Sequence, residues 1–278
     1  ENAELLWAAR GAGPGFFGIV VGFHLRLQPR PKFVGMKAQV FRIRHLEAVM
    51  AWADRAGPDV APFVEFQLVF DRKAMGIFAH GIQVLAPVLA SSWREARAAV
   101  DFIDKSPIRK LASFTLPLLP VSLDMMMKGG ERTLFLPNTR WTADSMWMNM
   151  PIDPLLPALR HIADTQPASP SHALWLNWNG PVQRPDMAFS QEHRTYLALY
   201  CGLGKGVDEA PHVNWATDHM KSLESWSRGI QLADENLARR PAKFVSDANM
   251  VRLDQARAKY DPQGRFHPWM GRLPTEAN

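Results

Sequence analysis

The sequence predicts an α+β fold with a central, largely antiparallel sheet of about seven strands, covered on one face by helices. Segments with apolar residues at every second position, typical of strands, alternate with segments whose apolar residues recur every three or four positions, typical of helices. Some strand-like segments follow one another closely enough to form hairpins. The chain has 278 residues, of which 47% are hydrophobic and 21% charged, and this suits one large domain, or one domain plus a fragment of another.

The first half of the chain supplies most of this pattern. The apolar alternation over 21–28 predicts a half-buried strand. The apolar stripe over 46–56 predicts a helix, which Gly57-Pro58 stops. The other elements expected here are a helix at 4–10, a strand at 36–43, a hairpin of strands at 64–70 and 76–85, and a helix at 91–104 that begins with a capping box of Ser92 and Glu95.

The second half is expected to add two strands and three helices. The strands are predicted at 172–179 and 195–203, and the helices at 153–165, 213–237 and 250–259. Apolar residues recur at intervals of three or four over the whole of 213–237, so the helix predicted there is the longest. Residues 106–170 are rich in proline and methionine, and the helix at 153–165 is the only element assigned there.

The composition narrows the classes of function. The net charge is +5, but the lysines and arginines are scattered, which favours a basic surface for an anionic ligand over a nucleic-acid-binding stripe. Cys201 is the only cysteine, so an internal disulfide and a zinc site of several cysteines are excluded. No apolar run approaches the ~18 residues of a membrane span. We therefore expect a cytoplasmic protein with no metal and with neither a membrane nor nucleic acid as partner.

A glycine-rich loop, Gly11-Ala12-Gly13-Pro14-Gly15, joins the first predicted helix to the first predicted strand. A dinucleotide-binding turn has the opposite order, strand then loop then helix, so this loop is not of that type. Glycines also allow a backbone to approach a phosphate or a flat ring closely. On spacing alone, a tight structural turn is favoured and a ligand contact stays open.

The segment that contains this loop, residues 2–29, resembles a signature of the FAD-linked oxidases of the vanillyl-alcohol oxidase/berberine-bridge-enzyme superfamily. The matching residues are Asn2, Leu5, Trp7, Ala8, Arg10, Gly11, Gly13, Gly15, Phe17, Gly18, Ile19, Val20, Phe23, Leu27 and Pro29. The chain departs from the signature at Ala12, Pro14 and Phe16, and Pro14 removes one backbone donor.

Two later segments resemble the same family. One begins at the end of the last predicted helix, and the other runs from the end of the first strand of the second half into the second strand. The matching residues are Lys259, Tyr260, Asp261, Pro262 and Phe266 in the first, and Gly180, Val182, Arg184, Ala188, Phe189, His193, Arg194 and Tyr196 in the second. Residues 30–170 resemble the family only in element order and composition.

The resemblance implies a division of the chain and a cofactor. It makes 1–30 the terminal loop and strand of an FAD-binding domain, 31–245 the substrate-binding domain, and 246–278 a helix and tail returning towards the FAD domain. FAD is then the cofactor of the complete protein, not retained by this chain alone, and the missing FAD-binding domain is a partner in cis or a separate chain. The cofactor-binding residues implied are Gly11, Gly13, Gly15, Gly18, Ile19 and Val20.

The resemblance also implies a reaction, hydride transfer from an alcohol or amine carbon of a small-molecule substrate to flavin, assisted by a base. Tyr196 and Tyr200 share one face of their predicted strand and, with His193, are the catalytic candidates; packing and solvated charge are the alternative roles. The substrate-binding candidates are Trp175, Asn177, Asn179 and Arg194.

Two further expectations follow. The helices at 46–56, 91–104 and 213–237 should bury one sheet face, and the face bearing Tyr196 and Tyr200 should be uncovered without its flavin domain, which favours a homo-oligomer. The alternative function is a non-catalytic ligand-binding or assembly module that lacks its flavin domain.

Overall fold

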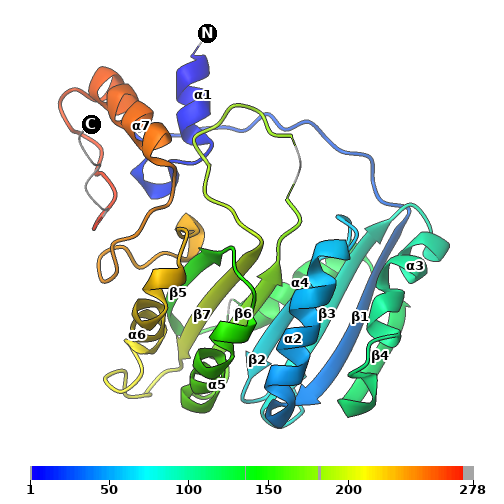
Figure 1. Cartoon of the computed structure of the whole chain (residues 1–278). Coiled ribbons are helices and arrows are strands. Elements are labelled where there is room, and N and C mark those ends of the chain that lie inside the picture. Colours follow the sequence, from blue (N-terminus) through cyan, green and yellow to red (C-terminus); the bar gives the residue numbers. More distant parts are fainter. Residues whose placement is uncertain (1, 135, 181–182, 272–278) are drawn as a thin grey trace.

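The computed structural model describes residues 2–134, 136–180 and 183–271. These residues form a seven-stranded sheet in the order β4-β1-β3-β2-β6-β7-β5, in which all neighbours are antiparallel (Figure 1). The strands are β1 Phe33–Arg42, β2 Gln67–Asp71, β3 Gly81–Ala90, β4 Ala112–Pro120, β5 Arg140–Met148, β6 His172–Asn177 and β7 Thr195–Leu203. The predicted α+β class is therefore confirmed.

Helices α2, α3, α5 and α6 cover one side of the sheet, called the helix face, and share its main apolar core (Figure 1). The helices are α1 Ala3–Ala9, α2 Leu46–Ala56, α3 Trp93–Asp104, α4 Leu123–Leu134, α5 Leu156–Thr165, α6 Trp215–Ser222 and α7 Asp247–Tyr260. Ser92 caps α3 by accepting from the Glu95 amide at 3.2 Å, but the Glu95 carboxylate accepts from Ser91 instead of Ser92. The predicted capping box is thus half formed.

The strand predicted at 21–28 does not form. This segment runs extended from the region of α1 to β1 without pairing with another described strand (Figure 1). Val21 is 96% exposed and Leu27 is 90% exposed. Alternation gives a segment a pairing face, but a strand also needs a neighbouring edge, and the described residues provide none here.

The sheet reaches seven strands because two strands form in the middle region, where none is predicted. Pro117 and Pro120 obscure β4, which tolerates them because it is an edge strand. The second half of β5 is buried on both sides, so its sequence lacks the alternation of a half-buried strand. Helix α4 connects these two edge strands and lies behind the sheet in Figure 1, opposite α2.

The long helix predicted at 213–237 is also wrong, because α6 ends at Ser222. Gly229 has a φ of +140°, which a helix cannot accommodate and which favours glycine. There the chain pairs with the free edge of β5, since the Trp147 amide donates to the Gly229 carbonyl at 2.7 Å. Residues 224–245, called the edge segment, therefore run along the border of the sheet instead of packing on it as a helix.

A second apolar core joins the two ends of the described chain. Helix α1 lies beside α7, away from the sheet (Figure 1). Lys259 pairs with Glu4 at 2.9 Å, and the Trp269 indole donates to the Ala12 carbonyl at 2.6 Å. The segment at 246–271 thus packs on the segment that resembles the end of an FAD domain, while the proposed domain boundaries stay a prediction.

His219 should make stability depend on pH. Burial, with a smaller contribution from the charge of His161, lowers the pKa of His219 to about 4, from 6.5 for an ordinary histidine. Between these values the unfolded chain binds a proton that the folded chain does not, so the free energy of unfolding should fall as the pH decreases from 6.5 to 4. After allowance for solvent screening, we expect a loss of about 1–2 kcal/mol.

Urea unfolding at stepwise pH values checks this expectation. A His219→Gln variant should show a shallower decrease over the window than the unaltered chain. A His24→Gln variant is the control, because His24 is exposed in the extended segment. Equal slopes in the two variants would contradict the assignment.

Candidate active site

Three polar side chains meet on the sheet face opposite the helix face, called the tyrosine face. The hydroxyls of Tyr196 and Tyr200, two positions of β7 that share this face, both donate to Oδ2 of Asp234, at 2.6 and 2.9 Å. Asp234 comes from the edge segment and ends a short 3₁₀ helix, Leu232–Asp234. Its other oxygen, Oδ1, has no hydrogen-bond partner within the described ranges. The site therefore holds a carboxylate with one bound and one available oxygen.

Aromatic rings surround these three groups. The ring of Trp147 lies 4.8 Å from that of Tyr196, and the ring of Trp178 lies 5.9 Å from Trp147. His172 stacks on Tyr200 at 4.7 Å, and burial lowers the pKa of this histidine. The polar cluster is thus set in an apolar, aromatic surrounding that strengthens its electrostatic interactions.

The tyrosine face is not uncovered, contrary to the sequence-based expectation. Tyr196 is only 5% exposed, because the edge segment reaches over the sheet border and lies on it. The reasoning that an exposed face would drive a homo-oligomer therefore loses its premise, and oligomerisation stays an untested prediction.

Burial, and after it the charge of the neighbouring groups, raises the pKa of Tyr196 and of Tyr200 well above the ordinary value for tyrosine. Both phenols therefore remain protonated near neutral pH and act as hydrogen-bond donors to Asp234. A deprotonated tyrosine would place a second negative charge beside the carboxylate in a buried site. Within this cluster, the carboxylate is the proton acceptor.

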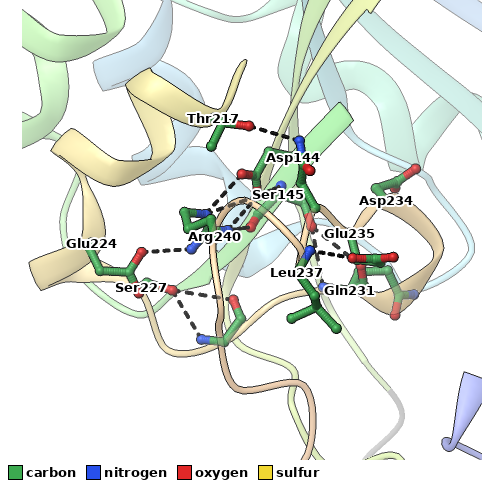
Figure 2. A network of polar contacts seen from close by, with 12 residues as sticks. Asp144, Ser145, Thr217, Glu224, Ser227, Gln231, Asp234, Glu235, Leu237 and Arg240 are labelled. Atoms are coloured by element: carbon green, nitrogen blue, oxygen red, sulfur yellow. Dashed lines mark hydrogen bonds and ion pairs between the residues drawn. The ribbon is translucent and has the colours of Figure 1, made fainter. Parts of the chain in front are cut away.

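A buried ion pair anchors the edge segment that carries Asp234. Arg240 donates from Nε and Nη2 to the Asp144 carboxylate at 3.0 and 2.6 Å, and from Nη1 to Glu224 at 2.7 Å (Figure 2). Asp144 is on β5 and is 1% exposed, while the Arg240 side chain is 3% exposed. The remaining Nη2 proton reaches the Ser145 carbonyl at 2.6 Å, so four of the five guanidinium protons have an acceptor.

Weaker contacts support the segment on both sides of Asp234. The Gln231 amide donates to the Ser145 hydroxyl at 3.3 Å, and Asn236 donates to Thr217 of α6 at 2.8 Å (Figure 2). Anchors on either side of a loop residue restrict where its side chain can point. Asp234 is thus held at the tyrosines by β5 and α6, not by its own short helix.

The glycine-rich loop lies next to the same segment. A Cβ on Gly13 would come 2.8 Å from Leu232, and one on Gly11 would come 2.1 Å from the Phe189 amide nitrogen. A Cβ on Gly15 would collide with the ring of Trp269. Close packing within the chain itself requires glycine at Gly11 and Gly15, whereas Gly13 is favoured by its φ of +52° and meets only the end of the Leu232 side chain. The loop and residues 231–233 also line an apolar pocket of about 310 Å³.

Gly18, Ile19 and Val20, the other cofactor-binding candidates, begin the extended exposed segment. Ile19 and Val20 project into solvent, and their amides make no backbone hydrogen bond to another described residue. Free amides beside apolar side chains suit a cofactor that combines a flat ring with polar edges. With the neighbouring apolar pocket, these residues fit one wall of a flavin site, while Pro14 offers no donor.

The substrate-binding candidates lie on the helix face, away from Tyr196 and Tyr200. Trp175 is buried against Phe66 in the main core. Asn177 and Asn179 both donate to the Gly57 carbonyl, at 2.8 and 3.2 Å. These bonds hold the chain after α2, which gives a structural reason for asparagines in and next to a strand.

The remaining two candidates are also separate from the cluster. Arg194 donates to the Asp54 carboxylate and carbonyl, both at 2.7 Å, and so ties β7 to α2. His193 is half-buried just before β7, where burial and the charge of Arg228 lower its pKa. It makes no hydrogen bond to the tyrosines or to Asp234 in the part of the chain that the structure describes.

Sequence reasoning missed Asp234, His172 and Trp147. The alternation of β6 does place His172 on one face with Leu174 and Leu176, so this residue could have been found. Asp234 has no such signal, because the apolar stripe over 213–237 predicts a helix there. Gly229 inside that stretch was the available warning.

Across residues 2–134, 136–180 and 183–271, no cluster of three or more metal-binding side chains occurs. In the same ranges no helix has the length and apolarity needed to cross a bilayer. Val182, one of the motif residues matched in the sequence, lies outside the described residues.

Comparison with known proteins places these features in context. No protein-family model matches the chain. The chain is 27% identical over 273 residues to FAD-linked oxidoreductase ptmO of Penicillium ochrochloron, and the match covers 96% of this chain but 59% of the relative. It thus spans about three fifths of that relative's length.

Solved structures share the fold over a similar extent. The match to 6-hydroxy-D-nicotine oxidase from Arthrobacter nicotinovorans has a TM-score of 0.73 at 18% identity and covers 96% of this chain and 60% of that one. The match to BBE-like 28 of Arabidopsis thaliana has a TM-score of 0.75 at 11% identity and covers 99% and 63%. In both cases part of the larger chain has no counterpart here.

Proposed function

We propose that this chain, which is related along nearly its whole length to FAD-linked oxidoreductases, supplies the substrate-binding part of an FAD-dependent enzyme that oxidises an alcohol or amine carbon. The observation that carries the proposal is the pair of hydrogen bonds from Tyr196 and Tyr200 to one oxygen of Asp234. The second oxygen of that carboxylate is available to a substrate. A small molecule bound against the aromatic rings of the tyrosine face would present its hydroxyl or amine there.

Asp234 is then the base, in a role that the sequence suggested for Tyr196, Tyr200 or His193. Its Oδ1 accepts the proton of the substrate hydroxyl or ammonium group as the adjacent carbon is oxidised. The two tyrosines hold the carboxylate in place and, as neutral donors, balance its charge before the proton arrives. The surrounding aromatic rings exclude water from the transfer.

FAD, held largely by an FAD-binding domain in cis or in a partner chain, would supply the hydride acceptor. This chain's contribution is the wall formed by Gly18, Ile19, Val20 and the apolar pocket beside the glycine-rich loop. The loop contacts Leu232, two residues before Asp234, so the same segment positions the base and lines this wall. We further propose a cytoplasmic location, consistent with a single buried cysteine.

The chain alone should purify without colour and without oxidase activity. Its flavin wall offers few amide donors, and each net hydrogen bond contributes only about 0.5–1.5 kcal/mol. Association costs at least about 4 kcal/mol, so tight binding of a dinucleotide needs more contacts than this wall provides. Gel filtration with absorbance detection of flavin is the measurement. Flavin that co-elutes with the 278-residue chain would overturn this account of the cofactor site.

The rival function is a non-catalytic ligand-binding or assembly module that lacks its flavin domain. Mass spectrometry of the natural protein separates the two. A larger polypeptide with bound flavin, or a separate flavin-binding partner chain, supports the enzyme. A natural product of this length with neither supports the module.

A further inference from the structure

A pocket of about 490 Å³ lies on the helix side of the sheet, between α3, the edge strand β4 and its neighbour β1. It is separate from the candidate active site, because Asp234 and the tyrosines lie on the opposite face. Its volume is within the range of small-molecule sites. The proposed function gives this pocket no role.

The polar side chains of the pocket carry an excess of positive charge. Lys37 lies at its base, 2% exposed, and its ammonium group donates to Asp104 at 2.8 Å. An ammonium has three donors, and the described residues provide only this one acceptor. Arg97 and Arg109 line the same pocket and form no ion pair within the described chain. Three cations thus face a single carboxylate, which leaves the pocket ready for an anion.

A second observation points to an unmet polar requirement beside the pocket, at a residue that does not itself line it. Gln39 lies two residues beyond Lys37 on the same face of β1 and pairs across the strands with Thr115, which lines the pocket. The Gln39 side chain is fully buried, yet neither its amide nitrogen nor its amide oxygen has a hydrogen-bond partner. Buried polar groups without partners are rare, and such a group marks a place where a water or a ligand is required.

The walls of the pocket determine what kind of anion fits. Trp93, Val100 and Leu118 line it beside the charged groups. Trp93 is partly exposed, with its ring packed edge-on against Phe33 at 5.3 Å. An inorganic anion would leave these apolar side chains exposed to water, whereas a molecule with an apolar part would bury their surface. Asp104 beside the ammonium disfavours multiply charged ligands, because each further negative charge would face the carboxylate.

We propose that this pocket binds a small monocarboxylate with an apolar group, whose carboxylate meets Lys37 and whose apolar part packs on Trp93. The carboxylate would occupy the donors of Lys37 that Asp104 leaves free. Arg97 and Arg109, at the exposed side, would contribute attraction from longer range. Ligand binding here would be independent of flavin.

Isothermal titration calorimetry of the protein with 4-phenylbutyrate tests this, with the neutral 4-phenylbutyramide and inorganic phosphate as comparison probes. We expect the acid to bind at least about tenfold more tightly than the amide, because a charge-assisted hydrogen bond is lost in the amide. Phosphate should bind more weakly than the acid. Equal affinity for acid and amide, or phosphate as the best ligand, would overturn the proposal.

Variants locate the binding site. Lys37→Met should weaken binding of the acid about tenfold or more. Because this lysine is buried and the variant could lose stability, Arg97→Gln provides a test at an exposed position, with an expected loss of about threefold. Arg94→Gln removes the same charge from α3 at an exposed residue that does not line the pocket, and should change nothing. An equal effect of Arg94→Gln and Arg97→Gln would show that only general electrostatics operates.

Discussion

Replacement of Asp234 by asparagine should lower kcat/KM of the flavin-containing protein by about 10²–10⁴-fold, with most of the loss in kcat. Asparagine keeps the size of the side chain and can still accept from Tyr196 and Tyr200, but it cannot take up the proton of the substrate. The fold should persist, because the anchors of the edge segment at Arg240 and Asn236 are unchanged. The chemical step is measured as the rate of anaerobic reduction of bound flavin, monitored by the loss of its visible absorbance.

Three further variants make this test specific. Tyr196→Phe and Tyr200→Phe each remove one donor to the carboxylate, and each should cost about tenfold, less than Asp234→Asn. Asp208→Asn, in an exposed loop, is the matched control and should retain full activity. Near-normal flavin reduction in Asp234→Asn would eliminate this residue as the base. A larger loss in Tyr196→Phe than in Asp234→Asn would return the role to the tyrosine.

Replacement of Arg240 by methionine should destabilise the protein by about 3–5 kcal/mol, because it leaves the Asp144 carboxylate buried without its partner. Methionine occupies a similar volume, so the loss reports the unpaired charge more than a cavity. Urea unfolding followed by tryptophan fluorescence measures the change in the free energy of unfolding.

A double variant and an exposed pair control this measurement. Asp144→Leu combined with Arg240→Met removes both charges and should recover most of the lost stability. Lys243→Met breaks the exposed pair with Asp247 and should change stability by no more than about 1 kcal/mol. If Arg240→Met and Lys243→Met cost the same, the buried pair does not anchor the edge segment.

Local patterns in the sequence predicted those parts of the fold whose physical cause is local. Helix α2 forms over the predicted residues because the signals for it are local: an apolar stripe along the helix and the Gly57-Pro58 stop directly after it. The placement of Tyr196 and Tyr200 on one face follows from strand alternation in the same way. The strand predicted at 21–28 does not form, because a strand depends on a partner edge that its own residues do not encode.

The candidate site was only partly predictable, because half of it depends on a long-range arrangement. Asp234 reaches the tyrosines only because Gly229 pairs with β5 and because Arg240 binds Asp144, which lies nearly a hundred residues earlier in the chain. No periodicity encodes such contacts. Asn177 and Asn179 show the converse: their polar character predicts a role in substrate binding, which stays a prediction, while in the structure both amides donate to the Gly57 carbonyl on the helix side.

The route of the edge segment around β5 connects the stability of the helix side of the sheet with the position of the candidate base on the tyrosine face. Asp144 faces the helix-side core, whereas Ser145 and Trp147 face the tyrosines, so the segment is fixed on one side of the sheet and used on the other. A subglobal opening that releases Arg240 would withdraw Asp234 while the seven strands remain folded. Amide hydrogen exchange at 229–237 should therefore increase at a lower denaturant concentration than exchange in the sheet. Activity should be lost at the concentration at which 229–237 opens, not at the one at which the sheet unfolds.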